Sequence, residues 1–468
     1  MNWRSLRAGA IAGPLAQTIL VAAAMGLVAV VASALLMWSI IQLDHGQLRT
    51  SVRQAFQDET LVAKSGPLFD LRRGDYLFND CLILQTLLLG RDDWRHSVID
   101  ATIYLSDDPC RVLQEEVTDQ TPMLPTYQYA RYLFSARVAS APLIGLFGVD
   151  RAKQVLKWAV YVTLLLAALA CLRGLASAPA SSTPTKTLYM TGLLCVVTML
   201  GLYRLEYYAQ TFAHGYSELV IAAFLLHSVT SAYGRRLAGT PTAAIVLGVL
   251  TGCFELLSGP ILVAVGMAVL LDYGAAPTRK HPYRRAMLVG VGCVAGMAMT
   301  MFWQLAIISA LSDSRPFYQF ATHLAMRLQL HQFFEIPFDP RWAIVANLQL
   351  YSLVDVASAI GTALPQLTYG SPLAAWMVFA ASPLAIAAAL VLSPTATRPG
   401  CVIAAVVALS VPVWYVAFSN HTVLHSLYMI RIAVLVPLCA GVSLMLVFAP
   451  VSWTHPGKSL EDSEIRAH

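Results

Sequence analysis

Residues 17–42 read QTILVAAAMGLVAVVASALLMWSIIQ and contain no charged side chain. A helix needs about 20 consecutive apolar residues to cross the roughly 30 Å hydrocarbon layer of a bilayer. This run is solidly apolar rather than alternating, and only helices or closed barrels satisfy their backbone hydrogen bonds inside lipid. The stretch therefore predicts a membrane-spanning helix. Because it is longer than the apolar part of a signal peptide, we expect it to be a retained anchor.

Similar apolar runs recur along the chain, which is 57% hydrophobic and only 12% charged. A soluble globular protein carries about 25% charged residues. We therefore predict an all-α fold, a polytopic transmembrane helical bundle of about ten spans. The fifth and sixth spans are short and meet at Gly259-Pro260, so they could instead form one kinked or re-entrant unit. The expected spans are 17–42, 154–174, 187–203, 216–233, 241–255, 258–273, 287–311, 371–393, 401–418 and 430–450.

Basic residues give the expected orientation, because cytoplasmic loops of membrane proteins are enriched in Lys and Arg. With the N-terminus in the cytoplasm, every predicted cytoplasmic connection is short and basic, whereas the opposite connections hold most of the Asp and Glu. The net charge of +5 follows from these basic connections and calls for no nucleic-acid partner. The basic connections contain Arg4, Arg7, Arg173, Lys186, Arg235, Arg236, Arg279, Lys280, Arg284, Arg285, Arg398 and Lys458.

Two connections on the extracytoplasmic side are much longer than the others, and loops beyond about 15 residues are usually functional or disordered. The first is rich in aromatic and aliphatic residues and is expected to contain amphipathic juxtamembrane helices near 79–89 and 93–105. Together the two loops are expected to roof the bundle. The predicted division is 1–42 (tail and first anchor), 43–153 (first extracytoplasmic loop), 154–311 (transmembrane bundle), 312–370 (second large loop), 371–450 (C-terminal transmembrane helices) and 451–468 (cytoplasmic tail).

Of the eight cysteines, Cys81 and Cys110 alone lie in the first long loop. An oxidising outer compartment would allow them to form a disulfide, although sequence spacing cannot fix the geometry and two free thiols remain the alternative. The other six lie in or beside apolar runs, where cysteine acts as a small packing residue.

Two acidic residues in the segment GDYLFNDC are candidate catalytic bases, Asp75 and Asp80. A carboxylate at the membrane surface can take a proton from a substrate hydroxyl, and burial among apolar side chains would raise its pKa toward a useful range. The alternative is that Asn79 or Asp80 caps the helix that runs through Leu84.

Further charged residues near the same face are candidates for the site. Arg131 suits a phosphate or pyrophosphate group, although an arginine beside lipid often only extends its charge to the headgroups. Glu206 is either a second carboxylate of the site or the ion-pair partner of Arg204. Glu255 would be costly near the membrane unless it faces a polar cavity, so it is a candidate substrate-binding residue.

A last group lies between the ninth and tenth spans and contains Asn420, His421, His425 and Arg431. Residues four apart share one face of a helix, so the two histidines could hold a metal ion. Thr422 stands where a zinc-protease motif needs Glu, and no other metal pattern occurs, so we assign no metal ligand while a divalent ion remains possible. The preferred role is hydrogen bonding or proton donation to a phosphate leaving group, and structural polar contacts are the alternative.

The layout of a retained first span, a long outer loop with juxtamembrane helices and an early Asp, and many further spans resembles the GT-C superfamily of integral-membrane glycosyltransferases. Asp75 or Asp80 matches the loop acidic residue of that superfamily, whereas the paired acids of many members and the WWDYG-type motif are absent. Segments 78–84, 129–134 and 420–425 also look like bacterial polytopic proteins linked to surface polysaccharides.

The resemblance implies an enzyme in a bacterial inner membrane with its active face outside. Its donor would be a polyprenyl-phosphate-linked sugar, its acceptor an envelope polysaccharide, lipid or protein, and its reaction a single inverting displacement. Because nucleotides are scarce outside the cytoplasm, and no Walker A loop, GxGxxG, GxSxG or HExxH motif occurs, a lipid-linked donor fits the chain. The competing hypotheses are a transporter or flippase of a lipid-linked or anionic substrate, a non-catalytic scaffold for envelope assembly, and a different transferase such as an acyltransferase.

Overall fold

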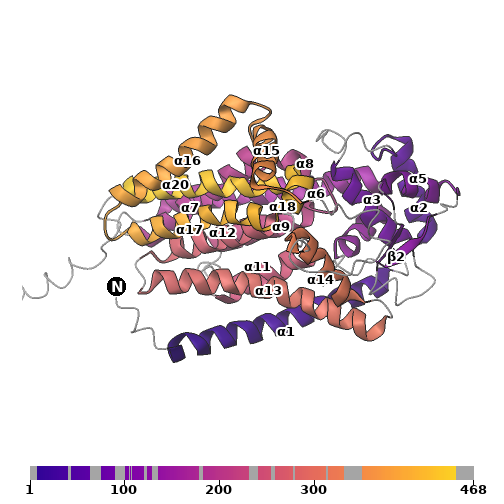
Figure 1. Ribbon diagram of the computed structural model, residues 1–468, viewed down its shortest axis with the longest axis horizontal. Coiled ribbons are helices and arrows are strands. Elements are labelled where there is room, and N and C mark those ends of the chain that lie inside the picture. Colours follow the sequence, from indigo (N-terminus) through magenta and orange to yellow (C-terminus); the bar gives the residue numbers. More distant parts are fainter. Residues whose placement is uncertain are drawn as a thin grey trace, which may run out of the picture.

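The computed structural model describes most of the chain and shows a bundle of long helices with a smaller unit at one end (Figure 1). All statements below refer to the described residues. These are 8–40, 44–63, 75–89, 101–104, 106, 108–120, 124–128, 135–178, 183–230, 241–254, 259–277, 280–312, 315–330 and 350–448.

Each of the ten apolar ranges expected from the sequence overlaps a helix, so the all-α class is confirmed, and the apolar helices suggest an integral membrane protein. Seven segments in the described residues are long and apolar enough to cross a membrane, whereas α9, α11 and α12 are apolar but shorter. The fifth and sixth ranges form two separate helices, α11 and α12. The ten helices are α1 (Ala8–Ile40), α6 (Ser135–Ser177), α7 (Thr183–Leu202), α9 (Gly215–Thr230), α11 (Pro241–Phe254), α12 (Pro260–Ala275), α13 (Pro282–Leu311), α16 (Pro372–Leu392), α17 (Arg398–Ala417) and α20 (Leu435–Phe448).

The described residues between 44 and 128 form the unit at the end of the bundle, which we call the first-loop unit (Figure 1). It contains α2 (His45–Gln57), α3 (Asp75–Leu88), α5 (Pro109–Val117) and a two-stranded antiparallel sheet of β1 (Thr102–Tyr104) and β2 (Thr126–Gln128). The helix predicted near 79–89 is present as α3. The helix predicted near 93–105 is wrong at its end, because residues 102–104 pair with 126–128 as strands.

The long helix α6 links the first-loop unit to the bundle and is broken at Gly148. Gly148 has φ 77° and ψ 171°, a conformation that glycine adopts without the steric cost of a Cβ atom. The break separates the short N-terminal part of α6 from a longer part that begins at Val149, carries Asp150, Arg151, Lys153 and Lys157, and is free of charge from Ala159 to Leu172.

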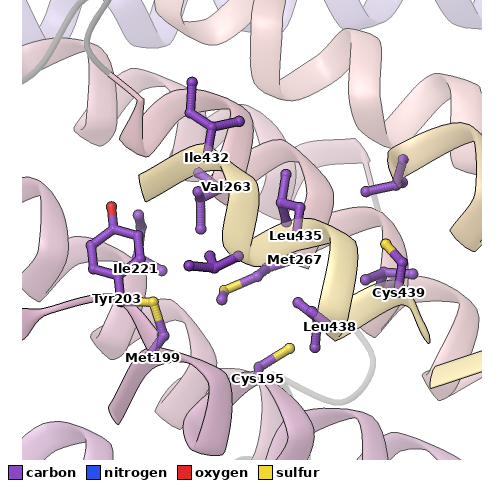
Figure 2. Packing of buried hydrophobic residues seen from close by; sticks show 14 of the residues in the cluster. Cys195, Met199, Tyr203, Ile221, Val263, Met267, Ile432, Leu435, Leu438 and Cys439 are labelled. Atoms are coloured by element: carbon purple, nitrogen blue, oxygen red, sulfur yellow. The ribbon is translucent and has the colours of Figure 1, made fainter. Parts of the chain in front are cut away.

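The core of the bundle is a continuous layer of buried apolar side chains from several of these helices (Figure 2). Figure 2 shows Met199, Ile221, Met267 and Leu435 converging from α7, α9, α12 and α20. Helices α11 and α13 approach so closely that a Cβ at Gly248 would lie 1.9 Å from the carbonyl oxygen of Cys293. Small residues that permit such contact are characteristic of helix packing in membranes, where lipid gives no hydrophobic drive for helices to associate.

Short helices lie at the end of the bundle that faces the first-loop unit (Figure 1). The capping box of Ser352 and Asp355 begins α15, because the serine hydroxyl accepts from the Asp355 amide and the carboxylate accepts from the Ser352 amide. These short elements are α8 (Leu205–Tyr208), α14 (Pro316–Arg327), α15 (Leu353–Ala363), η4 (Leu364–Thr368), α18 (Ser419–Leu424), α19 (Ser426–Met429) and η5 (Ile430–Val434).

Candidate functional site

Asp80 lies in the middle of α3 and is fully buried. Its Oδ2 is 2.8 Å from Nζ of Lys153, which is buried on α6, and its Oδ1 accepts a hydrogen bond of 2.7 Å from the amide of Phe212. Both carboxylate oxygens therefore have a partner of opposite charge or a hydrogen-bond donor, as a buried charge requires. Asp80 joins the first-loop unit, α6 and the segment before α9, and it does not act as a helix cap.

The segment before α9 brings a histidine into the same region. The hydroxyl of Thr211 accepts from the amide of His214, and its carbonyl accepts from the amide of Gly215, which starts α9. A Cβ atom at Gly215 would lie 2.5 Å from the carbonyl oxygen of Ala209, so this tight turn needs glycine. The turn buries the His214 ring, with Nε2 lying 3.5 Å from Nδ2 of Asn79.

Arg431 and Glu218 form a second buried ion pair, with Nη1 and Oε1 2.6 Å apart and both side chains fully buried. Arg431 Nε also donates to the carbonyl of Tyr428 at 3.0 Å. Its guanidinium carbon lies 4.2 Å above the ring centroid of Tyr208, in cation–π geometry. The Tyr208 hydroxyl in turn donates to the carbonyl of Leu427, so the pair fixes η5 against α8 and α9.

His421 and His425 lie one helical turn apart, because the amide of His425 donates to the carbonyl of His421 at 2.9 Å. Their ring centroids are 4.6 Å apart. Burial, followed by the nearby Arg327 cation, lowers the pKa of His421 well below its usual value and that of His425 to about 4. Both rings are therefore neutral at physiological pH. Nε2 of His421 is buried and has no hydrogen-bond partner in the described part of the chain.

Gln329 holds the histidine-bearing helix α18 in place. Its amide nitrogen donates to the Ser419 hydroxyl and to the carbonyl of Tyr351 at 3.0 Å, and its amide oxygen accepts from the Tyr351 amide at 2.6 Å. One side chain therefore connects the end of α14, the chain before α15 and α18. Asn420 and Thr422 of α18 are also buried.

Ring contacts connect these groups into one region, which we call the inner polar cluster. The centroids of His214 and Tyr428 are 4.9 Å apart, and those of His425 and Tyr428 are 6.2 Å apart. No group of three potential metal-binding side chains occurs among the residues that the structure describes. The inner polar cluster consists of Asn79, Asp80, Lys153, Tyr208, His214, Glu218, His421, His425, Tyr428 and Arg431.

Of the other predicted site residues, the structure describes the side chains of Glu206 and Asn420, and neither is among the members named above. Glu206 pairs with Arg204 on the outer side of α8, which was the alternative left open by the sequence. Asp75 is the first residue of α3, but its side chain lies outside the described residues, as do Arg131 and Glu255.

Sequence reasoning missed six members of the cluster, which are Asn79, Lys153, Tyr208, His214, Glu218 and Tyr428. Lys153 carried a usable signal, because a lysine at the edge of an apolar helix needs a partner or a route to water. Tyr208, His214 and Tyr428 stand beside many similar aromatic residues, so nothing in the sequence distinguished them.

Cys81, which follows Asp80, forms a disulfide with Cys110 of α5, with an S–S distance of 2.06 Å. Gln85 of α3 supports the same junction by donating to the carbonyl of Pro109 at 2.8 Å and accepting from the amide of Tyr104 at 3.0 Å. The helix that carries Asp80 is thus fixed covalently and by hydrogen bonds to the rest of the first-loop unit.

Comparison of the chain with protein families, with curated proteins and with solved structures finds no match in any of the three.

Proposed function

We propose that this protein is an integral-membrane glycosyltransferase that moves a sugar from a polyprenyl-phosphate donor to an acceptor hydroxyl at the extracytoplasmic face. The observation that carries the proposal is the inner polar cluster, in which segments distant in the sequence place histidines, tyrosines and two ion pairs at one end of an apolar bundle. Ionisable groups held at such a boundary are costly and are usually retained for function.

The orientation is supported from both ends of the bundle. The disulfide of the first-loop unit needs an oxidising compartment, which lies outside the cytoplasm. Basic residues gather at the opposite end, where Arg285 pairs with Asp272 and where Lys186 and Arg398 lie near the starts of α7 and α17. We further propose that α9, α11 and α12 also cross the bilayer, which gives ten spans.

In the proposed reaction the acceptor oxygen attacks the anomeric carbon, and the bond from that carbon to the phosphate oxygen breaks. The phosphate leaves with its lipid, and the configuration at carbon inverts. The neutral rings of His421 and His425 suit hydrogen bonding to the departing phosphate, and Arg327 supplies positive charge near them. Stabilising the charge that develops on a leaving group is usually the largest contribution to such catalysis.

The acceptor proton must pass to a base, for which the sequence offers Asp75 and Asp80. Asp80 has both oxygens engaged by Lys153 and Phe212, which supports a positioning role for it. We therefore propose Asp75 as the base, at the start of the helix that Asp80 anchors.

The experiment compares membrane lipids from a deletion strain with those of strains carrying wild-type, His425→Ala or Thr362→Ala protein. Thr362 is exposed on α15, outside the cluster, and serves as the matched control. We expect a carrier-linked sugar to accumulate in the deletion strain and with His425→Ala but not with Thr362→Ala. Normal carrier lipids in the deletion strain would overturn the proposal.

Transport is a weaker alternative, because a transporter holds its polar groups near the middle of the bilayer in broken helices. Glu218 lies in the first turn of α9, and Arg431 lies in η5 before α20. Both therefore sit at one end of the bundle.

A further inference from the structure

A second group of aromatic and charged side chains lies on the other side of the α8 segment from the inner polar cluster. Tyr203 and Tyr208 contact Arg431 inside the bundle, whereas Arg204 contacts Glu206 and Tyr207. We call this second group the rim cluster; it consists of Trp158, Tyr161, Arg204, Glu206, Tyr207 and Tyr369.

Arg204 organises the rim cluster. Its guanidinium carbon lies 4.5 Å from the ring centroid of Tyr207 and 4.7 Å from that of Tyr369. The same group pairs with the Glu206 carboxylate and donates to the carbonyl of Gln366. Arg204 and Tyr369 both adopt the left-handed conformation, with φ of 58° and 56°, which is unfavourable for residues with a Cβ. Two strained residues from different connections thus meet in one stacked contact.

Three helices change from polar to apolar at this cluster. On α6, Asp150, Arg151, Gln154 and Lys157 precede Trp158, and the stretch from Ala159 to Leu172 carries no charge. Helix α7 is apolar up to Leu202 and is followed by Arg204. Tyr369 precedes α16, whose residues all lack charge.

The exposed side chains change in the same way, from polar-tipped rings at the rim cluster to apolar side chains beyond it. Trp158 is 61% exposed and Tyr369 is 66% exposed. On the apolar side of them, Leu165 of α6 and Met377 of α16 are exposed as well, with no polar group to justify contact with water. Indole and phenol rings have an apolar body and a polar tip, and they concentrate where hydrocarbon meets the headgroups.

We propose that the rim cluster contacts the phospholipid headgroup layer of the leaflet on the side of the first-loop unit. The exposed apolar residues beyond it then contact acyl chains. The stacked Arg204 ties the chain between α7 and α8 to the turn before α16, so both are held at one depth. This inference needs the membrane class of the fold but not the transfer reaction.

The position of the rim cluster also indicates where the inner polar cluster lies relative to the membrane. Tyr207 and Tyr208 are neighbours that face the rim and the inner cluster respectively. The inner polar cluster therefore lies beside the headgroup layer, within the thickness of one short helix.

The test measures depth in the full-length protein reconstituted into phospholipid nanodiscs. Single cysteines replace Trp158, Tyr369, Met377 or Arg111 and carry an environment-sensitive fluorophore. The six native free cysteines are buried, and the other two form the disulfide. Quenching is compared for lipids with a nitroxide just below the headgroup, for lipids with a nitroxide near the chain end, and for a water-soluble quencher.

Labels at W158C and Y369C should lose more fluorescence to the shallow nitroxide than to the deep one, whereas M377C should show the reverse order. R111C, on the first-loop unit, should respond only to the water-soluble quencher. If W158C and Y369C respond like R111C, the rim cluster faces water or a soluble partner such as a glycan or protein, and the proposal is overturned. Responses like those of M377C would equally reject it, because the cluster would then lie among acyl chains.

Discussion

At the scale of single residues, Asp80 was a candidate catalytic base in the sequence. In the structure it has a defined position, but its role is that of an ion-pair partner. A carboxylate among apolar residues predicts either a base with a raised pKa or a helix cap. In the structure Asp80 has a lysine and an amide within hydrogen-bond distance. The sequence could not show this, because Lys153 and Phe212 are far from Asp80 along the chain and only the tertiary fold brings them together.

Replacing Asp80 by Asn should destabilise the protein, because it leaves the buried Lys153 charge without its carboxylate. Breaking one partner of a buried ion pair costs roughly 3–5 kcal/mol. The double variant Asp80→Asn/Lys153→Met removes both charges and should recover most of that loss. The measurement is the thermal unfolding midpoint in detergent. An unchanged midpoint for Asp80→Asn alone would contradict the structural role of the pair.

Stability should fall as the pH decreases from 6.5 toward 4. His425 has a pKa of about 4 in the folded protein and of about 6.5 when unfolded, so the unfolded chain binds more protons in this window. The contribution of the neutral His425 ring to the stability of the folded protein is complete above pH 6.5 and is lost as the pH falls. His421, whose pKa is also lowered, acts in the same direction.

The measurement for this pH dependence is the unfolding midpoint between pH 7 and pH 4. The double variant His421→Gln/His425→Gln should show a shallower decline than the wild type. Thr362→Ala, which changes an exposed side chain that carries no titratable group, is the control and should not alter the slope. Equal slopes for the double variant and the wild type would show that these rings do not titrate differently on folding.

At the scale of helices and strands, the apolar runs predicted the bundle well, because a membrane helix is specified by composition within one continuous segment. The first-loop unit was less predictable. Strands β1 and β2 are three residues each and pair across a long separation, which leaves no local pattern to detect. The break in α6 was not predicted, since Gly148 resembles many other glycines in the sequence.

Loss of the disulfide should destabilise the first-loop unit. Its cysteines are 29 residues apart, and a crosslink of this kind typically contributes about 2–4 kcal/mol. The variant Cys81→Ser/Cys110→Ser should unfold at lower temperature and should be cut sooner by protease within residues 44–128. A reductant should lower the midpoint of the wild type but not that of the double variant. Cys293→Ser, which changes a buried free thiol, is the control for cysteine replacement itself.

At the scale of the whole molecule, the two ends of the bundle differ in chemistry. One end carries the disulfide and the inner polar cluster, and the other carries basic residues beside the apolar helices. This difference between the two ends was predictable, because the excess of basic or acidic residues can be read from the sequence of each connection. The meeting of α3, α6, α9 and η5 was not predictable, because it depends on how the helices pack.

Cysteines introduced at the two ends should react differently with a membrane-impermeant maleimide applied to intact cells. Arg111 is exposed on α5, and Thr395 is exposed between α16 and α17 at the opposite end. We expect R111C to be labelled on intact cells and T395C only after permeabilisation. The opposite pattern would place the first-loop unit in the cytoplasm and remove the basis of the proposed function.

Helix α6 carries both Lys153, which holds Asp80, and Trp158 at the rim. The two residues are fixed about 7.5 Å apart along the axis by the 1.5 Å rise of an α-helix. The helix therefore rigidly connects the rim cluster, which we propose to contact the lipid headgroups, to the first-loop unit. If a thicker or thinner bilayer shifts or tilts α6, Lys153 moves with the helix. The distance between Lys153 and Asp80 should then change with the thickness of the membrane.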